Sequence, residues 1–129
     1  MSSKLNDVGS LVVAAAIQPT VALATSITSA GVDLSSAGVD CFGIQNVGTV
    51  GSTSVSLAGK FQEASTATGT YADISGATFA AQTSTTGAQI VSTVKFLRTQ
   101  PWVRYVGTVA GTTPTIALDV MVGGLKVQV

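Results

Sequence analysis

The chain has 129 residues, six of them lysine or arginine and six aspartate or glutamate, with no histidine and a formal net charge of zero. Charged residues make up 9% of the chain, whereas about 25% is usual for a soluble domain. A hydrophobic content of 46% excludes a disordered chain, which would be apolar-poor and highly charged. A general nucleic-acid-binding protein is excluded as well, because it needs a surplus of basic residues.

The scarcity of charge also bears on the state of the chain in solution. A net charge near zero promotes association, because copies of the protein do not repel one another. Two interpretations follow. The chain is either a small β-domain kept soluble by its serine and threonine hydroxyls, or a subunit whose neutral surface is normally covered by its own copies or by a larger particle. The length predicts one domain over residues 1–129.

Turn-forming residues separate short segments rich in β-branched side chains along the whole chain. This spacing is typical of an all-β sandwich or barrel. The alanine-rich start is the best helix candidate, but a strand is preferred there too. Residues 48–52 are expected to form a loop. The predicted strands are residues 11–17, 20–27, 39–47, 53–63, 70–74, 89–96, 102–110, 115–122 and 125–129.

Apolar and polar residues alternate within several of these strands. Val55, Leu57 and Phe61 share one face of the segment 53–63, and every second residue from Ile116 to Val122 is a branched apolar one. One apolar and one polar face per strand is what two stacked antiparallel sheets require. The alternation therefore predicts an antiparallel β-sandwich.

The segments that separate the predicted strands give further expectations. Pro101 and Pro114 should each stand directly before a strand, because proline cannot donate a hydrogen bond to a ladder. The low-complexity stretch 64–86 is expected to be a loop or hairpin excursion. The pentapeptide Ser-Ala-Gly-Val-Asp occurs twice and ends at Asp33 and at Asp40. Both aspartates are expected to flank turns that lead into strands.

The residue types needed for most catalysis are missing from the sequence. Without histidine, neither a Ser-His-Asp nor a Cys-His arrangement is possible. The lone cysteine, Cys41, is expected to be a buried, inert apolar residue. It rules out an internal disulfide and a thiolate metal cluster. The carboxylates are scattered, and no phosphate-binding loop is present. We therefore expect no enzyme, no metal and no cofactor.

Half of the basic residues fall within ten positions, at Lys95, Arg98 and Arg104. Aromatic residues are interleaved with them, including Trp102. Aromatic and arginine side chains together supply many of the energetic hot spots of protein interfaces. Three interpretations stay open. The first is an ordinary strand in which Trp102 packs in the core while Arg104 alternates to solvent, and the second is a protein interface. The third, and the least favoured because the rest of the chain adds no positive field, is a site for single-stranded nucleic acid, which also stacks on aromatic residues beside arginine.

Several short motifs stand out between about Ser26 and the C-terminus. They are Gly31-Val32-Asp33-Leu34, Ile44-Gln45-Asn46-Val47-Gly48, the run from Val55 to Ser65, Gly69-Thr70-Tyr71-Ala72-Asp73-Ile74, Val103-Arg104-Tyr105-Val106-Gly107-Thr108-Val109 and Gly111-Thr112-Thr113-Pro114-Thr115. These motifs are similar to those of tailed-bacteriophage capsid cement proteins, also called head decoration proteins. The acidic turn that precedes an aromatic residue in the family is replaced here by Ala64-Ser65-Thr66-Ala67-Thr68-Gly69.

The resemblance implies a jelly-roll sandwich of about eight strands. It also implies a non-enzymatic virion protein on the capsid exterior, assembled in the host cytoplasm and cementing neighbouring major capsid proteins. Its expected partners are the major capsid protein and copies of itself, a trimer being preferred to a dimer, with neither nucleic acid nor membrane. The expected contact residues are Lys95, Arg98, Trp102 and Arg104, together with Lys4 and Asp7 in an extended N-terminal arm over residues 1–10.

Two other functions stay open at this stage. A phage tail or neck component shares related sequence patterns with the cement proteins. A carbohydrate-binding or host-surface-binding β-sandwich module belongs to a different class, and it would stack sugar rings on exposed aromatic residues. The aromatic residues that could serve are few, namely Trp102, Tyr71 and Tyr105, and burial of their rings would count against this function.

Overall fold

The computed structural model describes residues 12–51, 54–83 and 90–126, and these ranges contain strands and no helix. The alternating, β-branched sequence explains this, because such side chains pack well on a pleated sheet. The strands are β1 (Val12–Leu23), β2 (Ile27–Thr28), β3 (Val32–Asp33), β4 (Ala37–Gly51), β5 (Ser56–Ala64), β6 (Ala72–Thr78), β7 (Gln82–Thr83), β8 (Ile90–Leu97), β9 (Trp102–Ala110) and β10 (Thr115–Lys126).

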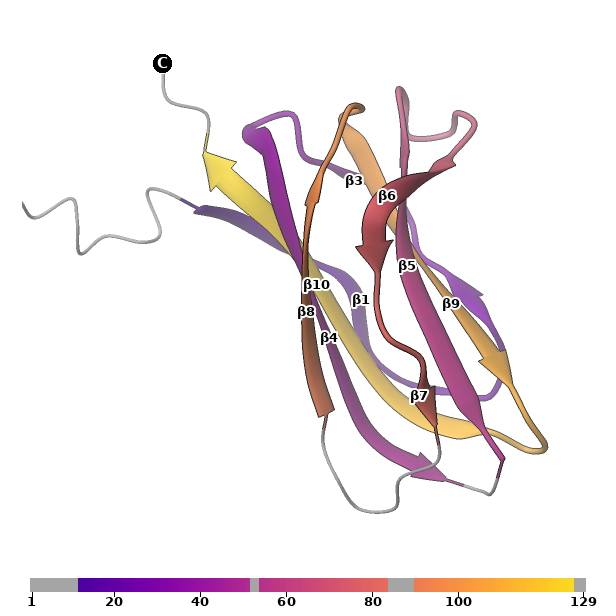
Figure 1. Ribbon diagram of the computed structural model, residues 1–129. Helices are drawn as coiled ribbons and strands as arrows, with labels where there is room; N and C mark the ends of the chain where they lie inside the picture. Colours follow the sequence, from indigo (N-terminus) through magenta and orange to yellow (C-terminus); the bar gives the residue numbers. More distant parts are fainter. Residues whose placement is uncertain (1–11, 52–53, 84–89, 127–129) are drawn as a thin grey trace, which may run out of the picture.

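The strands form two antiparallel sheets packed face to face (Figure 1). The four-stranded sheet has the order β1-β10-β4-β8, and the six-stranded sheet has the order β2-β9-β5-β6, with β3 also paired to β9 and β7 to β5. The short strands β2 and β3 both pair with β9, and β6 and β7 both pair with β5, so each of these two couples occupies one strand position. The sandwich then has eight strand positions. Numbered in chain order, they are arranged as 1-8-3-6 in the four-stranded sheet and as 2-7-4-5 in the other sheet. This is the strand order of a jelly roll, so the predicted fold class is confirmed.

Three strands run further than the sequence pattern predicted. β1 joins the predicted segment 11–17 to the first part of the predicted segment 20–27, because register shifts on both sides of Gln18 accommodate Pro19 in this edge strand. The rest of that second segment is not part of β1, since residues 24–26 lie outside the strands and Ile27 begins β2. The predicted loop at residues 48–52 is wrong, since β4 continues to Gly51 and pairs there with Thr115 of β10.

The last strand, β10, likewise joins two predicted strands. It continues through Gly123 and Gly124, because both of its neighbours, β1 and β4, pair with it in that stretch. Other expectations are confirmed: β9 and β10 begin directly after Pro101 and Pro114. The excursion after residue 64 returns as β6 and β7 to pair with β5. Asp33 flanks a turn, where its carboxylate accepts the Ser35 N–H at 2.9 Å. The same expectation for Asp40 is wrong, because Asp40 lies inside β4, which begins at Ala37, and stands opposite Leu97 of β8.

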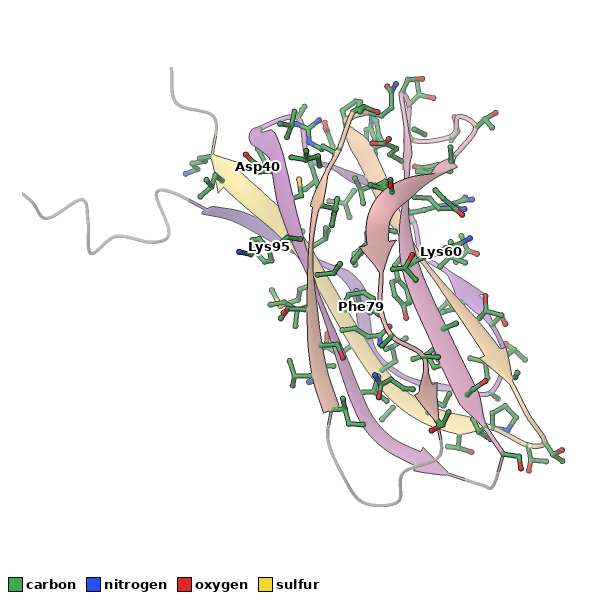
Figure 2. The ribbon with its side chains drawn as sticks, viewed as in Figure 1. Asp40, Lys60, Phe79 and Lys95 are labelled. Atoms are coloured by element: carbon green, nitrogen blue, oxygen red, sulfur yellow. The ribbon has the colours of Figure 1, made fainter. Side chains whose placement is uncertain are left out.

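The core lies between the two sheets and is centred on Phe61 of β5. Its ring centroid lies 5.3 Å from that of Phe96, 5.6 Å from that of Phe79 and 5.8 Å from that of Tyr105. These rings come from both sheets, and Phe79 lies between them in Figure 2. The predicted apolar faces are confirmed, because Val55, Leu57, Phe61 and the alternate residues from Ile116 to Val122 are all buried.

One hydrogen bond crosses this apolar core from sheet to sheet. The Tyr105 hydroxyl on β9 donates to Gln45 Oε1 on β4 at 2.6 Å, and both side chains are fully buried. Gly59 lies against the pair, and a Cβ there would overlap the hydroxyl and the amide oxygen. Burial raises the pKa of Tyr105 well above its ordinary value.

Candidate functional site

The fold separates the basic residues that stand close together in the sequence. Lys95 lies on β8 of the four-stranded sheet, whereas Arg104 lies on β9 of the six-stranded sheet. Both side chains point outward, because their neighbours Phe96 and Tyr105 point into the core. Lys95 and Arg104 therefore lie on opposite outer faces of the sandwich and do not form one cluster.

Arg98 lies in the connection between the two sheets. Its guanidinium donates to the carbonyl oxygens of Ala37 at 2.5 Å, Gly38 at 3.2 Å and Gln100 at 3.3 Å. These bonds hold the start of β4 against the end of β8. Arg98 is thus a structural residue in the isolated chain. The expected contact residues Lys4 and Asp7, and the whole arm over residues 1–10, lie outside the described residues.

Arg104 belongs to a chain of paired polar side chains on the outer face of the six-stranded sheet. Its guanidinium lies 4.2 Å from the centroid of the Tyr71 ring, and its Nε donates to Gln62 Oε1 at 2.9 Å. Gln62 Nε2 donates in turn to Asp73 Oδ1 at 2.8 Å, and Lys60 Nζ donates to Asp73 Oδ2 at 2.9 Å. The hydrogen bond from Gln62 and that from Lys60 lower the pKa of the Asp73 carboxyl.

Trp102 lies two residues before Arg104 on β9, on the same side of the sheet, and is half-buried there. A Cβ at Gly31 would overlap the Tyr71 hydroxyl and lie 3.4 Å from the Trp102 ring, so both aromatic side chains border the Gly31 backbone. The Tyr71 hydroxyl donates to the Ala67 carbonyl at 2.8 Å. We name the surface made by these side chains the aromatic–arginine surface; its members are Trp102, Tyr71, Arg104, Gln62, Asp73 and Lys60.

Sequence reasoning singled out Trp102 and Arg104 but missed their partners. Gln62 and Lys60 stand at alternate positions of β5, opposite Arg104 and Val106 of β9. Their outward direction follows from the alternation that places Phe61 in the core. The contribution of Tyr71 and Asp73 depends on the pairing of β6 with β5, where Asp73 stands opposite Gln62. No local pattern specifies that register.

The outer face of the four-stranded sheet has a different character. Phe42 and Ile44 of β4 are half-buried there, and Met121 of β10 stands opposite Ile44. Leu97 and Leu125 are 62% and 59% exposed. We name this surface the apolar face; it also carries the exposed charges Asp40 and Lys95, and Figure 2 shows Lys95 projecting away from the sandwich on this side, whereas Lys60 projects from the other sheet.

A groove of about 600 Å³ opens at one end of the apolar face. Phe42, Leu97 and Leu125 give it apolar walls, while Asp40 and Lys95 give it one charge of each sign. Cys41 and Phe96 complete its lining. Cys41 is 4% exposed, as predicted, and its burial raises the pKa of its thiol.

Comparison with known proteins adds no relative. No protein-family model matches the chain, and no curated protein matches it. Among the described residues, no group of three or more Asp, Glu, Cys or His side chains is placed to hold a metal ion. Nor does any helix long and apolar enough to cross a membrane occur in the part of the chain that the structure describes. The candidate functional surfaces are the two outer faces, which carry the aromatic–arginine surface and the apolar face with its groove.

Proposed function

We propose that the protein is a non-enzymatic structural subunit of a tailed-phage virion. In this role it binds the outer surface of the assembled capsid and holds neighbouring major capsid proteins together. The jelly-roll strand order supports the proposal, because this architecture is common among viral capsid domains, although lectins and cupins use it too. The motifs that resemble capsid cement proteins narrow the choice to the virion.

The observation that carries the proposal is the aromatic–arginine surface. Trp, Tyr and Arg are the residue types enriched in interface hot spots. Here Arg104 is held in place by Tyr71 and Gln62, and Gln62 is held by Asp73. Because these side chains are already ordered, less conformational entropy is lost when a partner docks on them. An ordered, polar-aromatic surface suits a partner protein that the subunit meets after folding.

Capsid binding explains how such a surface stabilises a lattice. A protein that binds the assembled state and not the separate subunits shifts the equilibrium toward assembly by mass action. Many equivalent sites on one particle multiply weak contacts into strong overall retention, provided that each subunit reaches two neighbours. The scarcity of charge fits this role, since most of the surface would then face other proteins and not water.

Alanine variants at the centre of the aromatic–arginine surface test the proposal. Trp102→Ala and Arg104→Ala should each weaken binding to purified capsids by about tenfold or more, which is the effect of losing a hot-spot side chain. Thr108→Ala is the matched control, because Thr108 is exposed on the same face of β9 but stands apart from the cluster. Co-sedimentation with capsids, after circular dichroism has verified folding, measures the difference.

Three outcomes would contradict the proposal. Folded Trp102 and Arg104 variants that decorate capsids like the wild type would show that this surface is not the contact. Wild-type protein that stays in the supernatant would remove the capsid role itself. Specific binding of the isolated protein to a glycan, lost in Trp102→Ala but with no capsid binding, would place the protein in the carbohydrate-binding class.

A further inference from the structure

The apolar face of the four-stranded sheet carries two opposite charges that have no ion-pair partner within the described part of the chain. Asp40 on β4 and Lys95 on β8 are both exposed, and the ion pair found among the described residues joins Lys60 to Asp73 on the other sheet. Large apolar side chains lie beside them, Leu97 and Leu125 being more than half exposed. We propose that this face binds a second copy of the chain, forming a two-fold symmetric dimer.

The strand register places four residues of the groove at the corners of a rectangle, with charged and apolar residues at alternate corners. Asp40 stands opposite Leu97, and Phe42 stands opposite Lys95, in the antiparallel pairing of β4 with β8. One diagonal of the rectangle is therefore the charged pair, Asp40 and Lys95. The other diagonal is the apolar pair, Phe42 and Leu97. All four side chains line the same groove.

When two such faces pack together around a two-fold axis that lies between them, the charged and the apolar residues can both find partners. If the axis crosses the charged diagonal at its midpoint and at a right angle to it, Asp40 of one copy meets Lys95 of the other, and the reverse pair forms by symmetry. With strands about 4.8 Å apart and alternate residues about 6.8 Å apart, the apolar diagonal then runs nearly along the axis. Phe42 and Leu97 each meet their own counterpart. The strands of the two copies cross at about 70°, close to the orthogonal class of sheet packing.

The composition and size of the face favour a second copy over another partner. Homodimer interfaces are more apolar than transient ones, and Phe42, Ile44, Leu97, Met121 and Leu125 supply that character here. Four strands spaced about 4.8 Å apart over about eight residues cover about 500 Å² per copy. The total of about 1,000 Å² reaches the lower limit for a specific interface. The balanced charges make the face complementary to itself and not to a surface of one sign.

Charge reversal in the full-length protein tests the proposed pairing directly. In Lys95→Asp, both intermolecular pairs become Asp–Asp, and in Asp40→Lys both become Lys–Lys. Each variant alone should dimerise about tenfold or more weakly than the wild type. An equimolar mixture of the two variants should recover dimerisation, because a heterodimer restores two Asp–Lys pairs. Analytical ultracentrifugation over a concentration series measures all four samples.

The control is Thr108→Asp, which introduces a negative charge on the outer face of the opposite sheet, apart from the aromatic–arginine surface, and should leave dimerisation unchanged. A wild-type chain that stays monomeric at high concentration overturns the proposal. So does a trimer, or a dimer that neither single reversal weakens. The other segment that could cover the apolar face is the chain's own N-terminal one, and deletion of residues 2–11 tests this alternative. A full-length chain that stays monomeric and dimerises only after the deletion would show that this segment covers the face, and would overturn the proposal. These measurements need no capsid, so they fail or succeed independently of the proposed function.

Discussion

At the scale of single residues, the least expected feature is the polar pair inside an otherwise apolar sandwich. Tyr105 and Gln45 come from different sheets, and the hydroxyl donates to the amide oxygen at 2.6 Å. Gln45 Nε2 is also buried, with no hydrogen-bond partner among the described residues. An unpaired buried donor costs more than a paired one contributes. The pair therefore fixes how the sheets face each other and adds little net stability.

A double-mutant cycle measures this pair. Tyr105→Phe leaves the Gln45 amide wholly unpaired and should lower the free energy of unfolding by about 1–3 kcal/mol. Replacing both partners, in Tyr105→Phe with Gln45→Leu, should cost less than the sum of the two single changes. Urea denaturation monitored by tryptophan fluorescence provides the four stabilities. Strictly additive effects would mean that the two side chains do not interact.

The buried phenol also predicts a loss of stability at alkaline pH. Burial raises the pKa of Tyr105 in the folded state, so the unfolded chain releases this proton first as the pH rises above about 10. The unfolded state then binds fewer protons than the folded state, and the free energy of unfolding falls with increasing pH. Below that pH the stability is fully present. The slope between pH 9 and pH 11 should become shallower in Tyr105→Phe, and an unchanged slope would contradict this assignment.

At the scale of strands, the alternation of apolar and polar residues predicted which side chains point into the core better than it predicted which strands pair. The inward residues of β5 and β10 follow from apolar residues at every second position, because burial of one sheet face enforces this period. The lengths of β1, β4 and β10 could not be predicted, since glycines and a proline that punctuate the sequence are accommodated by neighbouring strands. Strand pairing depends on contacts between distant segments, which no local pattern contains.

The candidate surfaces also combine features that local sequence predicts with features that depend on contacts between distant segments. Lys95 and Arg104 are close in sequence, yet β8 and β9 belong to different sheets, so the two side chains point in opposite directions. Conversely, Tyr71 and Arg104 are distant in sequence but lie 4.2 Å apart, ring centroid to guanidinium carbon. The sequence therefore indicated candidate contact residues, while the topology decided which of them share a surface.

Glu63 at the end of β5 ties the β8–β9 connection to the six-stranded sheet. Its carboxylate accepts the Thr99 N–H at 2.7 Å, the Thr99 hydroxyl at 2.8 Å and the Gln100 N–H at 3.1 Å. Bonds to a charged acceptor are stronger than neutral ones. Glu63→Ala should therefore lower the free energy of unfolding by about 1–3 kcal/mol, and Glu63→Gln by less.

Hydrogen exchange locates the effect of that change. The Thr99 and Gln100 amides should lose protection in Glu63→Ala more than the amides in the middle of β10 do, because the carboxylate binds them directly. Thr108→Ala, on the exposed face of the neighbouring strand, is a suitable control. Unchanged protection at residues 99 and 100 would show that the turn is held by other contacts.

At the scale of the whole molecule, the two outer faces divide the proposed tasks. The six-stranded sheet presents ordered aromatic, polar and charged side chains, whereas the four-stranded sheet presents mainly apolar ones. Because the faces lie back to back, a subunit can hold a capsid protein on one side and its own copy on the other. With few charges to keep the free chain soluble, covering both faces is the state that this surface favours.

Electron cryomicroscopy of virions that carry this protein tests the proposed function most directly. We expect jelly-roll density in many copies on the exterior of the capsid, bridging neighbouring major capsid proteins, with the Trp102 side of the six-stranded sheet toward the lattice. Reconstructions that place the protein in the tail or neck, inside the shell, or nowhere in the particle would contradict the proposal.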